Sequence, residues 1–147
     1  MVQPELRDAL FNPSDNRENF KQIIAKRSDL VQFDRGRLGP SQIGSYLYAG
    51  TVLGLASTGG DAGYYKPYNS ANTDGSQTAV AVLSEDANVT TPVGSLAGPT
   101  GDGSEIVMIR EGTLFKDLLI GLDAGAITSL GGHSFVENGQ NLIRIRA

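Results

Sequence analysis

The chain contains a single imidazole, and its sequence neighbours do not supply the partners that acid–base catalysis needs. His133 lies in the segment Gly131-Gly132-His133-Ser134. A general base acts on a nucleophile or substrate that another group holds within hydrogen-bond reach. The sequence has no Gly-x-Ser-x-Gly elbow, no His-Glu-x-x-His motif and no second histidine. We therefore interpret His133 as a structural or solvent-facing residue.

Acidic side chains and glycine-rich loops are the other candidates for chemistry. Glu85-Asp86 and Asp102/Glu105 could form the carboxylate pair of a glycoside hydrolase, but adjacent acids at strand ends are usually only solvated. The loop 98–104 lacks the lysine of a phosphate loop, and its aspartate would repel phosphate. The absence of cysteine excludes a thiolate metal site. We expect no catalytic residue, no metal and no cofactor.

Three tyrosines form a third candidate site. Tyr64, Tyr65 and Tyr68 lie close together in sequence and could stack against a sugar or a nucleobase. Tyrosines grouped on a short strand are more often core or interface residues, because the ring is apolar and the hydroxyl needs one polar partner. We favour that structural interpretation and keep a ligand platform as the alternative.

The overall composition excludes several classes of protein. The chain has 147 residues, of which 39% are hydrophobic and 19% charged, so it can form a core of its own. The net charge of −4 argues against direct nucleic-acid binding. No segment approaches the roughly 20 apolar residues of a membrane helix. The N-terminal residues lack a secretory pattern, and the missing cysteines suggest folding in a reducing cytoplasm.

Glycines and charges are distributed unevenly, which predicts two parts. Residues 1–37 hold one of the 19 glycines but seven of the 12 basic and six of the 16 acidic side chains. Such a change in composition usually separates segments with different roles. We expect an N-terminal arm over residues 1–37, either helical or extended, and a glycine-rich body over residues 38–147.

Within the arm, one segment has the pattern of a helix. Asp15 and Glu18 have the spacing of a capping box, and Phe20, Ile23 and Ile24 follow at helical spacing. These residues predict a helix over 16–27, with mixed flanks at 4–11 and 30–33 that could be helical or extended. A helix of this length is marginal alone. It either packs on the body or orders against a partner.

The body has the pattern of a mainly β protein with short helices. Turn residues separate apolar runs, and Asn138-Gly139 suits a tight hairpin turn because both central positions need positive φ. A run of leucines predicts a short helix over 114–122. The remaining segments predict strands at 46–56 (with bends at its glycines), 63–68 (an edge strand, because of Pro67), 77–83, 105–110, 134–137 and 140–146.

Three ordered motifs resemble the lambda-type head decoration proteins of tailed bacteriophages. The chain reads Ala-Gly-Thr-Val-Leu-Gly at 49–54, a tyrosine-containing segment at 65–69, and Asp-Gly-Ser-Gln-Thr-Ala followed by a small-residue strand at 74–83. A charged strand, a leucine-bearing segment and an apolar C-terminal strand follow in the same order as in that family. The resemblance covers roughly residues 45–147.

The resemblance implies a capsid-stabilising role without catalysis. It implies a β-barrel-like or β-tulip body with an extended N-terminal arm, assembled as a homotrimer. Such trimers bind the outer surface of the expanded capsid at three-fold and quasi-three-fold positions, after synthesis in the host cytoplasm. The partners implied are the major capsid protein and, through the arm, neighbouring trimers. The predicted capsid contacts are the apolar arm residues Val2, Pro4, Leu6, Leu10, Phe11, Phe20, Ile23, Ile24, Leu30, Val31 and Phe33.

Two other functions fit parts of the sequence. A small trimeric nucleotide hydrolase of the dUTPase type would need an aspartate-bearing substrate loop and usually a glycine-rich C-terminal tail. This chain instead ends on the strand-like segment Leu142–Ala147. A receptor-binding or fibre-tip module would use exposed tyrosines and glycine loops equally well.

Overall fold

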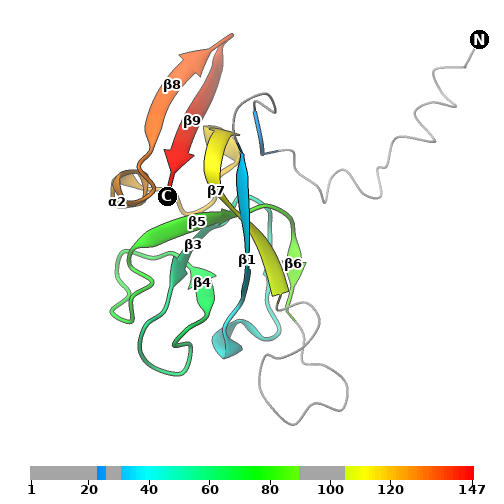
Figure 1. Cartoon of the computed structure of the whole chain (residues 1–147), viewed down its shortest axis with the longest axis vertical. Helices are drawn as coiled ribbons and strands as arrows, with labels where there is room; N and C mark the ends of the chain where they lie inside the picture. The colour runs from blue at the N-terminus through cyan, green and yellow to red at the C-terminus, as the bar shows by residue number, and fades with distance from the viewer. Residues whose placement is uncertain (1–22, 26–30, 90–104) are drawn as a thin grey trace, which may run out of the picture.

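The computed structural model describes residues 23–25, 31–89 and 105–147 and shows a mainly antiparallel β protein (Figure 1). The predicted fold class, mainly β with short helices, is confirmed. The helical elements are η1 (Pro40–Gln42), η2 (Lys116–Leu118) and α2 (Ala124–Ser129). The strands are β1 (Gln32–Arg37), β2 (Tyr46–Leu47), β3 (Val52–Leu55), β4 (Tyr65–Pro67), β5 (Ala79–Leu83), β6 (Ala87–Asn88), β7 (Glu105–Phe115), β8 (His133–Glu137) and β9 (Gln140–Arg146).

The long strand β7 connects the two ends of the main sheet. The strand order is β4-β3-β5-β7-β9-β8, with β1 also paired to β7, and β2 and β6 form a separate ribbon. The first half of β7 lies between β1 and β5, since Ile109 is opposite both Phe33 and Val82. Its second half pairs with β9, where Leu114 is opposite Ile143.

At one end, which we call the barrel end, the strands close into a ring. It comprises β1, β3, β4, β5 and residues 105–111 of β7. Leu38, directly after β1, forms a parallel bridge with Tyr65 of β4, and Gly39 N donates to Tyr65 O at 2.9 Å. This bridge closes the circuit β1–β4–β3–β5–β7. The ring encloses a core cluster of buried residues: Leu38, Leu53, Ala81, Leu83, Ala87, Val89, Ile106 and Met108.

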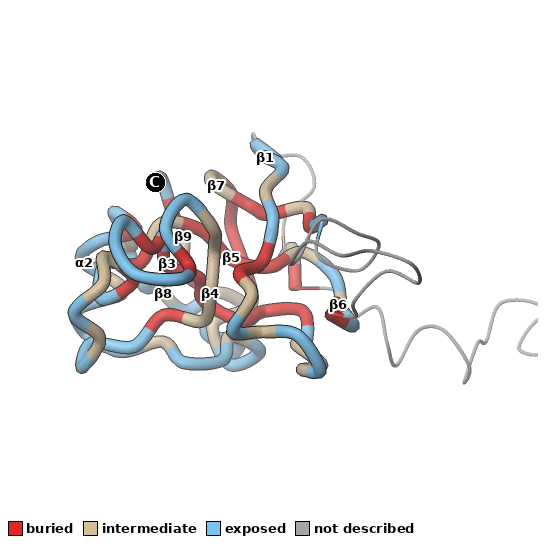
Figure 2. Tube along the Cα trace, turned by 90° about the horizontal axis from the view of Figure 1, so that it is seen from below, coloured by how far each residue is buried: buried red, intermediate tan, exposed pale blue. Residues whose placement is uncertain are grey.

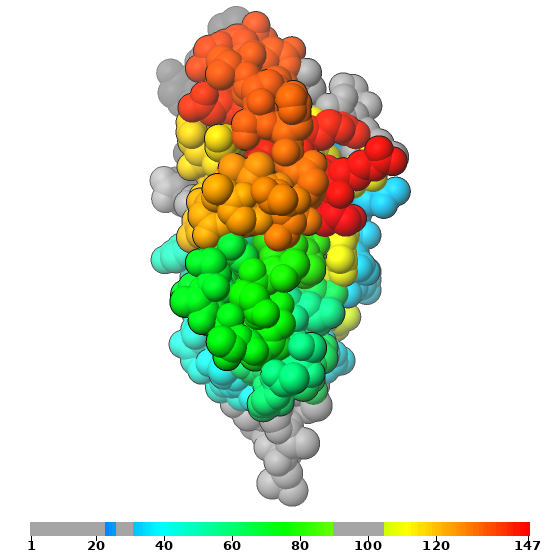
Figure 3. All heavy atoms as spheres, turned by 90° about the vertical axis from the view of Figure 1, so that its left-hand side faces the viewer, coloured from blue at the N-terminus to red at the C-terminus, as the bar shows by residue number. Residues whose placement is uncertain are grey.

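At the other end, the hairpin end, the sheet stays open. It comprises residues 112–115 of β7 together with α2, β8 and β9, and it lies above the barrel end in Figure 1. Figure 3 shows the α2 and β8 segments over the upper part of one face and the 69–78 loop below them. The apolar residues of this end join a second core cluster: Ile23, Val52, Tyr68, Ala79, Val82, Ile109, Leu114, Ala126, Leu130, Ile143 and Ile145.

The C-terminal hairpin has the predicted register. Asn138 and Gly139 adopt φ values of 53° and 77°, and Glu137 is opposite Gln140. Ile143 and Ile145 are buried, as the alternation of β9 predicts. The predicted bend at Gly50 is also confirmed, because its φ of 94° separates β2 from β3.

The helix predicted over 114–122 is wrong. Leu114 belongs to β7, only Lys116–Leu118 forms a single 3-10 turn, and the α-helix begins later, at Ala124. The spacing of the leucines predicts one helical face, but Leu114 pairs with Ile143 across the sheet. Sheet pairing by a neighbouring strand outweighs the local leucine spacing here. The helix starts where the Asp123 side chain accepts a hydrogen bond from Ala126 N at 2.8 Å.

The predicted helix over 16–27 is wrong in its described part. Ile24 forms an antiparallel bridge with Leu114, and Ala25 N donates to Thr113 O at 2.8 Å. Residues 16–22 and 26–27 lie outside the described residues, as does the loop 90–104. The change in composition near residue 38 falls directly after β1, a strand that is already part of the sheet.

Candidate functional site

The candidate catalytic groups in the described residues have structural surroundings. His133 is exposed, and its ring stacks on Phe135 with 6.2 Å between centroids. The Asp86 carboxylate accepts from Ala49 N at 2.7 Å and from the Tyr46 hydroxyl at 3.1 Å, so it holds the turn after β2. Asp102 lies outside the described residues. Within the described part of the chain, no group of three or more His, Asp or Glu side chains could hold a metal ion.

The clustered tyrosines make internal contacts. Tyr68 is only 7% exposed, and its hydroxyl donates to Asp123 Oδ1 at 2.9 Å. Arg110 Nη2 donates to the Tyr65 hydroxyl at 2.8 Å, and the Arg110 guanidinium lies 5.9 Å from the ring centroid. These contacts favour the structural interpretation of Tyr65 and Tyr68 over a ligand platform.

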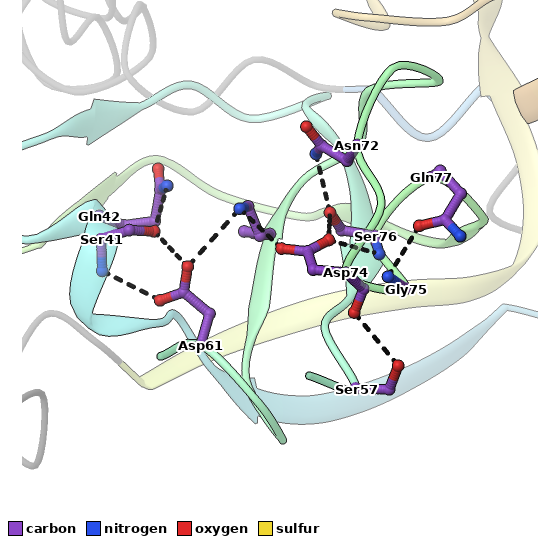
Figure 4. A network of polar contacts seen from close by, with 10 residues as sticks. Ser41, Gln42, Ser57, Asp61, Asn72, Asp74, Gly75, Ser76 and Gln77 are labelled. Carbon is purple, nitrogen blue, oxygen red and sulfur yellow. Dashed lines mark hydrogen bonds and ion pairs between the residues drawn. The ribbon is translucent and has the colours of Figure 1, made fainter. Parts of the chain in front are cut away.

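A network of polar side chains joins distant segments at the barrel end (Figure 4). Lys66 Nζ lies 3.0 Å from Asp74 Oδ2 and 3.5 Å from Asp61 Oδ2. Asp61 accepts from the Ser41 hydroxyl at 2.6 Å and from Ser41 N at 3.0 Å. Asp74 accepts from the amide and the hydroxyl of Ser76. One ammonium group therefore ties the η1 turn, β4 and the 74–77 turn together.

The network holds its carboxylates in the charged form. Hydrogen bonds from Ser76, and then the Lys66 ammonium, hold the pKa of Asp74 well below its usual range. Burial alone would raise the pKa of Asp61, but hydrogen bonds from Ser41 and the charge of Lys66 outweigh it and lower that pKa. The hydrogen bond to Asp74 raises the pKa of Lys66. These shifts match a structural ion-pair network, which perturbs pKa values without catalysis.

Two of the sequence motifs contact each other through a glycine. A Cβ on Gly54 would lie 2.4 Å from Ser76 O and 2.7 Å from Ser76 Cα, closer than any side chain allows. Ser76 itself is fully buried. Only a residue without a Cβ leaves room at position 54 for the backbone of the 74–83 motif. The two motifs are therefore linked by this close approach of their backbones.

Strand β1 is exposed along most of its length. Every residue of this strand except Gly36 is exposed, although its backbone pairs with β7 throughout (Figure 2). Phe33 is 55% exposed, and Arg35 and Arg37 follow at the spacing of one strand face. An apolar ring followed by two arginines on an accessible strand is typical of a protein-binding surface.

The predicted arm contacts divide into three groups. Ile23 is 2% exposed in the chain's own core, while Ile24 and Val31 are partly buried against that core. Phe33 is accessible on β1. The remaining predicted contacts lie outside the described residues: Val2, Pro4, Leu6, Leu10, Phe11, Phe20 and Leu30.

Sequence reasoning missed a second exposed aromatic surface. Tyr46 and Tyr48 are 45% and 52% exposed, and their rings meet edge to face at 5.1 Å. Their i, i+2 spacing within a strand-like segment was the available signal, because it places both rings on one face.

The described residues form no helix long and apolar enough to cross a bilayer.

Comparison with known proteins identifies the family. No curated protein and no solved structure was found to match the chain. The family model of the bacteriophage lambda head decoration protein D matches residues 24–126, more than half of the sequence and including β1, both contacting motifs and β7. The chain therefore belongs to the family of the bacteriophage lambda head decoration protein D, a structural component of the phage head.

Proposed function

We propose that this protein binds the outside of the expanded phage capsid as a homotrimer and stabilises the shell against the pressure of packaged DNA. Its sites are the three-fold and quasi-three-fold positions, and its partner is the major capsid protein. The family match over residues 24–126 is the observation that carries the proposal. A trimer contacts the capsid through three copies of the same surface. Each copy therefore needs only modest affinity, because the three contacts act together.

The exposed strand β1 is a candidate for the surface that contacts the capsid. β1 is held to the body by backbone pairing with β7, and its Phe33 ring is 55% exposed. A strand fixed in this way can present its exposed side chains to another protein while its own backbone pairing with β7 is kept. We assign Phe33, Arg35 and Arg37 to the capsid-facing surface together with the arm.

In this proposal the boundary between the arm and the body lies at Ile23 rather than between residues 37 and 38. Ile23 is buried in the body core and serves as the anchor of the arm, with Ile24 and Val31 packed beside it. The apolar residues before this anchor are the capsid contacts: Val2, Pro4, Leu6, Leu10, Phe11 and Phe20. The body begins at the anchor in this view and continues to residue 147.

Electron microscopy of reconstituted particles tests the function. Purified protein is added to expanded capsids that lack decoration, and the particles are imaged with and without it. We expect new density on the outside of the shell at three-fold positions and greater resistance of the particles to heat. Native mass spectrometry of the free protein measures the trimer separately. Bare three-fold positions at saturating protein would refute the capsid role.

Deletion of residues 1–22 tests the arm. This deletion leaves the Ile23 anchor and β1 in place, so the body should fold with an unchanged circular dichroism spectrum. We expect capsid binding to weaken at least tenfold. Full affinity in the truncated protein would assign capsid binding to the body alone.

A further inference from the structure

An open pocket lies between the η2 turn and the tip of the β8–β9 hairpin. Its volume is about 390 Å³, within the range of roughly 300–1,000 Å³ that small-molecule sites commonly have. It lies at the hairpin end, which the polar network and the capsid-facing surface proposed above leave unused. The lining residues are Phe115, Asp117, Leu118, Gly139, Gln140 and Asn141.

Hydrogen bonds on both sides hold the η2 wall of this pocket in place. Phe115, which precedes η2, is the last residue of β7. After η2, Ile120 N donates to Gly50 O at 2.9 Å. Within the turn, the Asp117 carboxylate accepts from Asn141 Nδ2 at 3.2 and 3.3 Å, which joins η2 to β9. The pocket is therefore formed before a ligand arrives, and binding does not have to order a loop.

The lining combines an aromatic ring with side chains that both donate and accept hydrogen bonds. Phe115 is half-buried and supplies the ring. Gln140 and Asn141 are exposed and carry amides, each with a donor and an acceptor, whereas the Asp117 carboxylate only accepts. A Cβ built on Gly139 would meet no heavy atom within 4 Å, so the hairpin side of the pocket opens to solvent. A ligand can therefore enter from the hairpin tip.

A pyranose sugar has a surface that matches this lining. One face of the sugar ring carries C–H groups, which pack against an aromatic ring. Two adjacent hydroxyls can donate to one carboxylate, and the others can donate to or accept from amides. A simple cation would use only Asp117 and leave the amides of Gln140 and Asn141 without ligand partners, while the charge of Asp117 repels an anion. The lining therefore fits a neutral saccharide best.

We propose that this pocket binds one pyranose ring of a neutral saccharide. The C–H face of the ring lies on Phe115, Asp117 accepts from two adjacent hydroxyls, and the amides of Gln140 and Asn141 bind the remaining hydroxyls. An open pocket of this size holds a single ring weakly, with a dissociation constant on the order of 1 mM. This inference goes beyond the proposed function and applies to the free protein. Many copies on one capsid, in the role proposed above, would make such weak contacts act together.

NMR titration of the free full-length protein tests the site. Methyl glycosides of glucose, galactose, mannose and N-acetylglucosamine are added separately to the isotope-labelled protein. We expect at least one of them to shift the amide signals of residues 115–118 and 139–141 in a saturable way, while the signals of β3 and β5 stay in place. If none of the four glycosides shifted the pocket residues saturably, the proposal would be overturned.

Variants of the pocket test the assigned contacts with the glycoside that binds. Asp117→Ala should weaken binding about tenfold, and Asp117→Asn, which keeps an acceptor, should retain more affinity. Phe115→Leu keeps an apolar side chain without the flat ring and should weaken binding about fivefold. The matched control Glu85→Ala removes an exposed carboxylate at the barrel end and should leave binding unchanged. Equal affinity in Asp117→Ala and the wild type would contradict the proposed site.

A ligand without hydroxyls distinguishes a sugar site from a cation site. Cyclohexylamine has a saturated six-membered ring and an ammonium group, so it can use Asp117 and the apolar wall but not the two amides as a sugar would. We expect the glycoside to bind more tightly than cyclohexylamine in the same titration. Tighter binding of cyclohexylamine, lost in Asp117→Asn, would identify a cation site and overturn the saccharide proposal.

Discussion

The barrel end and the hairpin end of this molecule are stabilised by different kinds of contact. At the barrel end, residues far apart in sequence approach closely, as Gly54 does with Ser76 and Ser41 with Asp61. At the hairpin end, the turn and the helix cap are local contacts, namely the Asn138-Gly139 turn and the Asp123 cap of α2, although Asp123 also accepts from the distant Tyr68 hydroxyl. The barrel end is a closed ring, whereas β8 lies at the end of the strand order.

This difference predicts how each end responds to substitution. A ring closed by non-local contacts has no room to adjust, because moving one strand moves all its neighbours. A hairpin end built from a turn and a helix cap can lose one local contact and keep its register. Substitutions at the barrel end should therefore cost more free energy of unfolding than substitutions at the hairpin end.

The largest effect is expected for Gly54→Ala. The new Cβ would meet the backbone of Ser76 within 3 Å, and β3 is paired with β4 on one edge and with β5 on the other, so it cannot shift without disturbing those strands. We expect a loss of about 3 kcal/mol in the free energy of unfolding. Denaturant titration measures it. Gly60→Ala is the control, because space is open around Gly60, and it should change stability by less than about 0.5 kcal/mol. Equal effects at the two positions would contradict close packing between the motifs.

The second effect concerns the ammonium group that joins Asp61 and Asp74. Lys66→Met leaves two carboxylates without their shared cation, and we expect a loss of about 2 kcal/mol near neutral pH. Lys116→Met removes the same charge at the hairpin end and should cost much less. Thermal unfolding of both variants measures the difference.

Acid pH sharpens the test of Lys66. The pKa values of Asp61 and Asp74 are lowered in the folded protein, so their contribution is complete above the ordinary value of about 4. It is lost as the pH falls through the folded values. The stability curves of the wild type and Lys66→Met should therefore converge on acidification. A constant difference down to pH values below about 3 would contradict the ion-pair network.

The same division explains what the sequence could predict. The β8–β9 hairpin and residues 105–110 of β7 follow from local signals, namely a turn dipeptide and short apolar runs, whereas the second half of β7 was not predicted. The closure of the ring through Leu38 and Tyr65 has no local signal, because it joins two segments that share no pattern. Ordered motifs identified the family, but only the structure shows that Gly54 and Ser76 touch.

The errors have one physical cause. Leu114 and Ile24 both occur at helical spacing, yet they pair with each other as strand residues. Leu114 lies in β7 and Ile24 lies beside it, and this ladder supplies backbone partners that an isolated short helix would lack. The candidate contacts Ile23 and Phe33 are both apolar residues of one segment, and sequence alone could not separate the buried one from the exposed one.

The third effect tests the cap at the hairpin end. Asp123→Ala removes the acceptor of Ala126 N and leaves the buried Tyr68 hydroxyl without its partner. We expect a loss of about 1.5 kcal/mol. Asp123→Asn keeps a side-chain oxygen for both donors and should retain most of the stability. If the asparagine variant were as unstable as the alanine variant, the carboxylate charge rather than the cap would be responsible.

The smallest effect is expected at the hairpin turn. Asn138 has a φ of 53°, which alanine adopts less readily than asparagine and which glycine adopts without strain. Asn138→Ala should cost about 1 kcal/mol, and Asn138→Gly should be close to neutral. Because this turn is exposed and far from the ring, neither variant should alter hydrogen exchange at β3 or β5. A loss at Asn138→Ala that spread to those strands would show that the two ends unfold as one unit, and the comparison between them would fail.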